Sequence, residues 1–146
     1  MAKQKQEQYL NELVASLGVF YIRLHQFHWF VEGKEFYTLH EEFENMYDEV
    51  TADLDEVAER MLQLNQKPLS TLAEYVEHSF IKEAPYTKKM SADEMVEATL
   101  ADYKVFQEKI KAGYDLFEGD EVTIDMLVGM NAKVDKHIWM LEATAK

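Results

Sequence analysis

The sequence predicts an all-α protein: a four-helix bundle with a short extra helix in its long middle connection. Gly (5) and Pro (2) are scarce among the 146 residues while Met (8) is frequent, a composition that favours helix over sheet. Four long segments carry apolar residues at helical spacing, and the second and third are joined by a long connection. The length of the chain, 146 residues, predicts one domain, residues 1–146, with a substantial core.

The first two helices are expected at about residues 5–31 and 35–64. At about 100° per residue, the apolar residues of the first fall in one sector about 100° wide. Gly33 is expected to end the first helix, and the segment 65–68, with Pro68, to end the second. The apolar stripe of the second helix consists of Phe36, Leu39, Phe43, Met46, Tyr47, Val50, Leu54, Val57 and Met61.

Residues 70–81 are expected to form the short helix of the middle connection, and 83–89 a loop. Ser91 and Glu94 form a capping box that opens the third long helix, which ends at the break 118–120. The fourth long helix is expected from about 122 to 144. Four amphipathic helices with one long crossover have the topology of ferritin-like folds.

Composition limits the classes of function. The formal net charge of −13 repels phosphate backbones and attracts cations. The absence of Cys excludes disulfides and thiolate metal sites. The polar start has no signal-peptide character, and the longest apolar run, 17–22, is too short to span a bilayer. We therefore expect a cytoplasmic protein without a membrane segment.

The stretch HQFHWFVEGKEFYTLHEEFE, residues 25–44, holds three of the five histidines and suggests a metal site. His28 lies on the first helix, and His40 and Glu44 lie one turn apart on the second. Asp55 and Glu59, also one turn apart, follow further along it. Imidazole and carboxylate without thiolate suit iron, manganese or zinc, and the spacing does not choose among these metals.

A distance argument indicates how these ligands could meet. Glu44 and Asp55 are eleven residues apart, which is about 16 Å along a helix axis. Since ligand atoms lie about 2 Å from a metal, one copy of the helix cannot bring both pairs to one ion. Our hypothesis is that two chains cross antiparallel at a two-fold axis and form two equivalent shared sites, so an isolated monomer would have no complete site.

Other interpretations of the same residues are also open. A di-iron site within one bundle is disfavoured, because such sites use Glu-x-x-His motifs and the chain has none. Asp55 and Glu59, taken alone, are typical of a solvated helix face. We interpret His25 and His137 as hydrogen-bonded core histidines rather than ligands.

Residues 25–61, with their His-Trp pair and the later Asp-x-x-Ala-Glu-Arg motif, resemble the signature of the Dps family, the mini-ferritins. The resemblance continues through 67–79, 84–87 and 135–141, nearly the whole chain. It implies a hollow dodecamer with ferroxidase centres, expected to hold two Fe each, at two-fold contacts. The implied ligands are His28, His40 and Glu44 of one subunit, with Asp55 and Glu59 of the partner.

The resemblance also implies the chemistry: oxidation of Fe(II), preferably by hydrogen peroxide, with storage of ferric mineral in the cavity. Glu44 stands where the family most often has Asp, and its extra methylene shifts the carboxylate at the second iron position. Trp29 corresponds to a family tryptophan thought to quench radicals, although simple packing is the alternative role.

The family's three-fold pores, through which iron enters, are lined by acidic residues near the start of the last helix. Glu121 and Asp125 match that place, and rings of carboxylates attract cations. Asp120 is a further candidate. Acids at a helix start are also favoured by the helix dipole, and for Asp120 we prefer that structural explanation.

Two other functions compete with iron storage. A DNA-condensing protein of the nucleoid is the main alternative, but Lys3 and Lys5 are the only basic side chains of a short N-terminal tail. Direct DNA binding is therefore expected to be weak or absent, and a salt-dependent gel shift would detect it. A purely structural bundle is the third reading, and it would bind no Fe(II) stoichiometrically.

Overall fold

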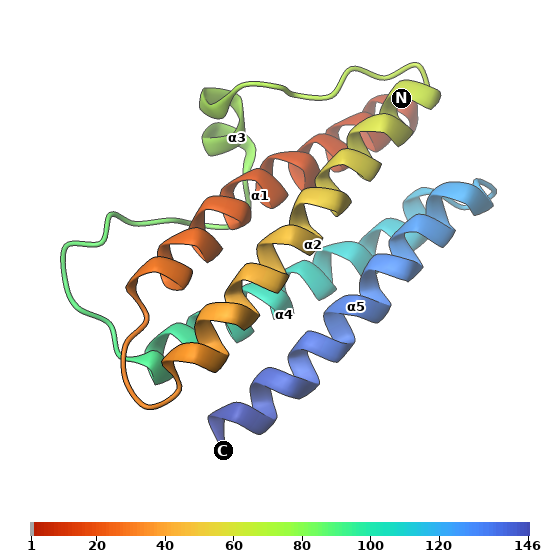
Figure 1. Ribbon diagram of the computed structural model, residues 1–146. Helices are drawn as coiled ribbons and strands as arrows, with labels where there is room; N and C mark the ends of the chain where they lie inside the picture. Colours follow the sequence, from red (N-terminus) through yellow and green to blue (C-terminus); the bar gives the residue numbers. More distant parts are fainter. Residues whose placement is uncertain (1) are drawn as a thin grey trace. The chain divides into compact units, whose positions relative to one another are not determined.

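The computed structural model describes residues 2–146, which form five helices (Figure 1): α1 (Ala2–Phe30), α2 (Phe36–Gln63), α3 (Leu72–His78), α4 (Ala92–Leu116) and α5 (Glu121–Ala145). Four long helices and a short one in the middle connection were predicted, and the prediction is confirmed. The helices belong to two compact units. Residues 7–92 form the first unit, and residues 2–6 with 93–146 form the second. Within the described residues, no helix is long and apolar enough to cross a membrane.

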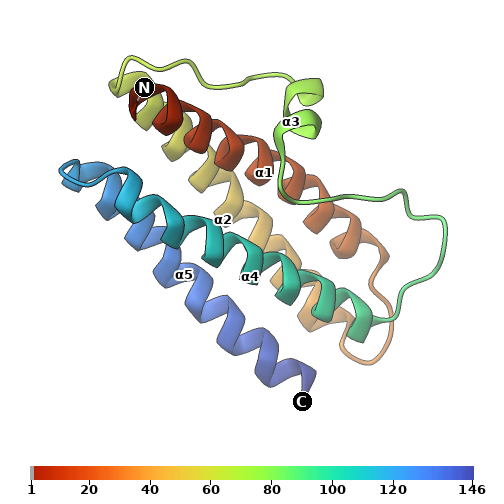
Figure 2. The same cartoon turned by 180° about the vertical axis from the view of Figure 1, so that it is seen from behind.

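In the first unit, α1 and α2 run side by side in opposite directions (Figures 1 and 2). Gly33 has φ of +110° in the turn between them, a conformation that glycine adopts without strain, and its carbonyl accepts a hydrogen bond from Phe36. At the far end of α2, Asn65 adopts φ of 60°. The amides of Asn65 and Gln66 donate to the carbonyls of Leu62 and Met61, so the helix ends before Pro68.

Polar side chains of α1 hold the segment that follows α2. Asn11 donates to the carbonyl of Lys67 and accepts from the amide of Leu69, at 3.1 and 2.8 Å. Glu7 accepts from the amide of Lys67 at 2.8 Å. These side chains replace the backbone partners that an irregular segment lacks, and they fix the start of the middle connection against α1.

Helix α3 is shorter than the predicted 70–81. Thr71 caps its start by accepting from the amide of Glu74, and the carboxylate of Glu74 accepts from Thr71 and Ser70. These hydrogen bonds hold the pKa of Glu74 below its ordinary value. After Ser79, the amide of Phe80 donates to the Ser16 hydroxyl on α1. This amide is therefore not available for a hydrogen bond within α3, and the helix ends.

In the second unit, α4 and α5 lie side by side and antiparallel (Figure 2). The rings of Tyr103 and His137 stack with centres 4.7 Å apart. Lys104 and Glu142 form an ion pair at 3.4 Å, between the first half of α4 and the end of α5. At the opposite end, Gln6 of α1 donates to the carbonyl of Leu116 at 3.0 Å.

Gly18 of α1 is the residue against which the α3 ring of Tyr75 packs. A Cβ at this position would lie 2.4 Å from Tyr75 Cδ2. We therefore expect Gly18→Ala to displace Tyr75 and to lower the free energy of unfolding by about 1–3 kcal/mol, despite the better helix propensity of Ala. Hydrogen exchange of the amides in α3 would measure the loosening.

Gly129→Ala is the matched control, because a Cβ there meets no atom within 4 Å in the chain. It should leave exchange in α3 unchanged. If Gly18→Ala also left α3 protected, the close approach of α1 and α3 would not depend on the missing side chain.

Candidate metal centre

His28 and His40 face each other across the turn between α1 and α2. Their rings stack with centres 3.7 Å apart and planes 13° from parallel. His28 Nδ1 lies 2.6 Å from the carbonyl oxygen of His40, and His40 Nδ1 lies 2.7 Å from the carbonyl oxygen of His28. Each ring is thus tied to the backbone of the other helix, an arrangement that we call the histidine clamp.

The histidine clamp fixes which nitrogen of each ring carries the hydrogen. A carbonyl oxygen can only accept, so Nδ1 of both rings must donate. In the neutral ring Nε2 then holds a free lone pair, which is the form that binds a metal. His28 is 7% exposed and His40 is half-buried, so both rings are held within packed surroundings.

Glu44 lies beside His28. His28 Nε2 lies 4.0 Å from Glu44 Oε1, and the Glu44 side chain is half exposed. Two ligand atoms that are each about 2.0–2.2 Å from one ion lie roughly 3–4 Å apart. The separation is long for a hydrogen bond and suits a cation between the two atoms. The donor set therefore fits a metal that prefers nitrogen and oxygen.

Asp55 and Glu59 are exposed on α2, beyond the histidine clamp along the same helix. Within residues 2–146 no group of three or more His, Cys, Asp or Glu side chains is arranged to hold a metal ion. The structure places His40 and Glu44 each in contact with His28, as two separate pairs, and it shows no contact between these residues and Asp55 or Glu59. Any site with all five residues needs a second copy of the chain.

A group of aromatic rings packs beside the histidine clamp and contacts it through Tyr47. Tyr47 of α2 is edge-on to His28, with ring centres 5.3 Å apart, and stacks on His25 at 3.7 Å. His25 Nδ1 is 2.7 Å from the Tyr21 carbonyl oxygen, and its ring contacts Trp29. Partial burial, then the carboxylate of Glu44, raises the pKa of Tyr47. Sequence reasoning missed Tyr47, which was assigned only to the apolar stripe.

The candidate pore residues lie at the start of α5. Glu121 and Asp125 are exposed, one turn apart. Asp120 is the N-cap of this helix: one carboxylate oxygen accepts from the Thr123 amide at 3.1 Å and the other from the Thr123 hydroxyl at 2.6 Å. These bonds give Asp120 a structural role in helix capping.

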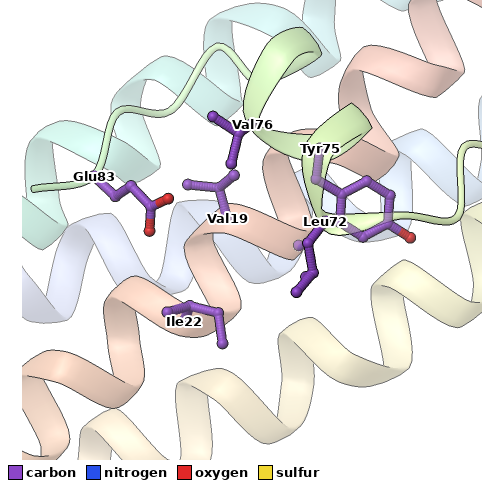
Figure 3. Close-up of a pocket in the computed structure, with 7 residues that line it drawn as sticks. Val19, Ile22, Leu72, Tyr75, Val76 and Glu83 are labelled. Carbon is purple, nitrogen blue, oxygen red and sulfur yellow. The ribbon is translucent and has the colours of Figure 1, made fainter.

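A pocket of about 360 Å³ lies between α1 and α3 in the first unit (Figure 3). Its lining is mostly apolar, and Glu83 is its one carboxylate: Gly18, Val19, Ile22, Leu72, Tyr75, Val76 and Glu83. Leu72 and Val76 are 75% and 60% exposed. Such a lining offers apolar surface and no set of metal ligands.

Comparison with known proteins places this geometry in a family. The family model of the ferritin-like domain matches residues 7–146. The chain is 42% identical over 139 residues to the DNA protection during starvation protein of Listeria innocua, covering 94% of this chain and 89% of that protein. It is 44% identical over 138 residues to general stress protein 20U of Bacillus subtilis, covering 93% and 94%.

Solved structures of Dps proteins are similar to this chain in fold. Dps from Listeria innocua soaked with cobalt has a TM-score of 0.94 and 42% identity, covering 95% of this chain and 90% of that one. Dps from Staphylococcus aureus has a TM-score of 0.94 and 39% identity, covering 98% and 96%. The chain is thus a ferritin-like protein, which confirms the predicted fold class. More particularly, it belongs to the Dps family.

The histidine clamp predicts the tautomer of two rings. Nitrogen-15 NMR at about pH 8 should show His28 and His40 with hydrogen on Nδ1 and a bare Nε2. His78, which is exposed on α3, is the internal control and should show a mixture of both tautomers. Hydrogen on Nε2 of either clamp histidine would contradict the assignment.

Proposed function

We propose that this protein oxidises Fe(II), preferably with hydrogen peroxide, at centres shared between two chains, and that it stores the ferric product in a hollow cytoplasmic oligomer. The observation that carries the proposal is the histidine clamp with Glu44 beside it. It presents two bare imidazole nitrogens, with a carboxylate oxygen 4.0 Å from one of them, and iron accepts both types of ligand.

The second copy of the chain is needed for the rest of the centre. Asp55 and Glu59 lie too far along α2 to join the ion held by His28 and Glu44 of the same chain. An antiparallel crossing about a two-fold axis would place the Asp55/Glu59 pair of one chain opposite His28 of the other. Exposed apolar side chains beside the pocket between α1 and α3, Ile22, Leu72 and Val76, supply surface that such a contact would cover.

The residues have separable tasks in this proposal. His28, His40 and Glu44 bind Fe(II), and Asp55 and Glu59 of the other chain complete the centre. Hard carboxylate ligands stabilise Fe(III) over Fe(II), which favours the loss of an electron. Two Fe(II) ions in one centre can deliver both electrons that one peroxide accepts, so no hydroxyl radical is released.

Relatives support this assignment of the histidines. One related structure, of Listeria innocua Dps, carries glycine in place of two histidines that are twelve positions apart. His28 and His40 are also separated by twelve positions. The cobalt and zinc soaks of that protein support a divalent-metal function for the fold.

The remaining candidate residues have proposed roles other than binding iron at the centre. In this proposal Trp29 quenches radicals that escape; its 64% exposure and its contact with His25 support that role. Glu121 and Asp125 would line pores around a three-fold axis of a dodecamer and draw Fe(II) inward. Asp120 contributes there by fixing the start of α5.

DNA condensation is the weaker second function. Several relatives are named for DNA protection during starvation, which favours a link to DNA. The net charge of −13 opposes direct contact with phosphates. Removal of Fe(II) and peroxide would by itself protect DNA, so the name does not require that this chain binds it.

The iron chemistry has a direct test. Anaerobic loading with Fe(II), followed by hydrogen peroxide, should consume about two Fe(II) per peroxide in a rapid phase, because each peroxide accepts two electrons. His28→Ala and Asp55→Ala should each lose the rapid phase while the oligomer stays assembled. Ferric absorbance, stoichiometry and light scattering are the measurements.

His78→Ala is the matched control for loss of an imidazole, since His78 is an exposed histidine on α3 away from the histidine clamp. It should keep the rapid phase. If His28→Ala and Asp55→Ala also oxidised iron at the wild-type rate, the centre would lie elsewhere and the proposal would be wrong.

A further inference from the structure

A row of aromatic rings leads from the proposed iron ligand His28 to the protein surface. Tyr47 is the inner ring, in edge contact with His28 at 5.3 Å between centres. His25 stacks on Tyr47 at 3.7 Å and meets Trp29 at 5.3 Å. Trp29 is 64% exposed and forms the outer end. Tyr47 is therefore the oxidisable side chain in direct ring contact with an iron ligand.

Tyr21 provides an internal comparison. Its ring lies 4.4 Å from His25 and 6.0 Å from Tyr47, between ring centres, so it belongs to the same packed group. It makes no ring contact with His28. Both tyrosines are half-buried, and they differ in that only Tyr47 adjoins the histidine clamp. Tyr47 also lies one helical turn beyond Glu44, so it is close to two of the proposed ligands.

The position of Tyr47 matters when a centre holds only one iron. Peroxide needs two electrons to become water, and a single Fe(II) gives one. The product of that one-electron step is a hydroxyl radical, unless a second electron arrives from a neighbour. Since electron transfer weakens steeply with distance, the neighbour must adjoin the metal ligands.

We propose that Tyr47 supplies the second electron for peroxide reduction when a centre holds a single iron. The proposal rests on the iron-oxidising function proposed above. Fe(II) loses one electron and becomes Fe(III). The phenol of Tyr47 loses one electron and its proton and becomes a tyrosyl radical. The O–O bond of hydrogen peroxide breaks, and with the phenolic proton and one proton from solvent the two oxygens leave as two waters.

The test uses the assembled protein, loaded anaerobically with one Fe(II) per centre and mixed with one equivalent of hydrogen peroxide. Freeze-quenched samples are measured by electron paramagnetic resonance, and a nitroso spin trap marks the oxidised side chain for peptide mass spectrometry. Wild type should give a tyrosyl signal with the adduct at Tyr47. Tyr47→Phe should lose both, and the yield of trapped hydroxyl radical should rise several-fold.

Tyr21→Phe is the matched control, because it removes a phenolic hydroxyl from another ring of the same packed group and leaves the ring next to His28 unchanged. It should keep the signal and the adduct at Tyr47. A tyrosyl signal of undiminished intensity in Tyr47→Phe, or a wild-type radical located on Trp29 with no adduct at Tyr47, would overturn the proposal.

Iron oxidation, followed in the same samples, separates this inference from the function on which it rests. If wild type oxidised Fe(II) with peroxide and formed no tyrosyl radical, the role of Tyr47 would be wrong and the proposed function would stand. If wild type did not oxidise Fe(II) faster than a protein-free solution, both would be wrong.

Discussion

The two reciprocal hydrogen bonds between His28 and His40 are the constraint on which the candidate centre depends. Each imidazole donates Nδ1–H to the backbone carbonyl of the other residue, at 2.6 and 2.7 Å. The bonds join the end of α1 to the start of α2 and orient both rings, and the bond to the His28 carbonyl satisfies an acceptor near the C-terminal end of α1. One pair of contacts thus closes the hairpin and leaves two nitrogens bare for a metal. The site is preorganised because it is also part of the fold.

The surroundings divide the site into a rigid and an open half. His28 is buried, Tyr47 is in edge contact with its ring, and His25 stacks on Tyr47, so the candidate nitrogen ligand His28 lies in packed surroundings. Glu44, Asp55 and Glu59 are exposed, so the carboxylates lie on the side from which a cation or a second chain approaches. In the proposed shared centre, iron chemistry would depend on assembly, because the carboxylates of the other chain would arrive only when the two-fold contact forms.

Much of the fold could be predicted from the sequence, because apolar periodicity and a few breaking residues define long helices strongly. The ends that were mispredicted depend on contacts distant in sequence: α3 stops at His78 because Phe80 bonds to Ser16, sixty-four residues away.

Candidate ligands could be found from residue type and spacing, and the distance along α2 already suggested a second chain. The histidine clamp and the ring contacts of Tyr47 could not be predicted from the sequence, since they depend on how α1 and α2 are rotated against each other.

The shared centre is the central claim, and mixed oligomers test it most directly. His28→Ala and Asp55→Ala chains would be unfolded together in equal amounts, refolded into one assembly, and assayed for rapid Fe(II) oxidation by peroxide. If ligands come from two chains across a two-fold axis, half of the dimers are mixed and each has one intact centre, so about a quarter of the wild-type amplitude should return. If all ligands of a centre come from one chain, every centre in the mixture carries a defect. The mixture would then show no more rapid oxidation than the two variants assembled separately, and the account would be contradicted.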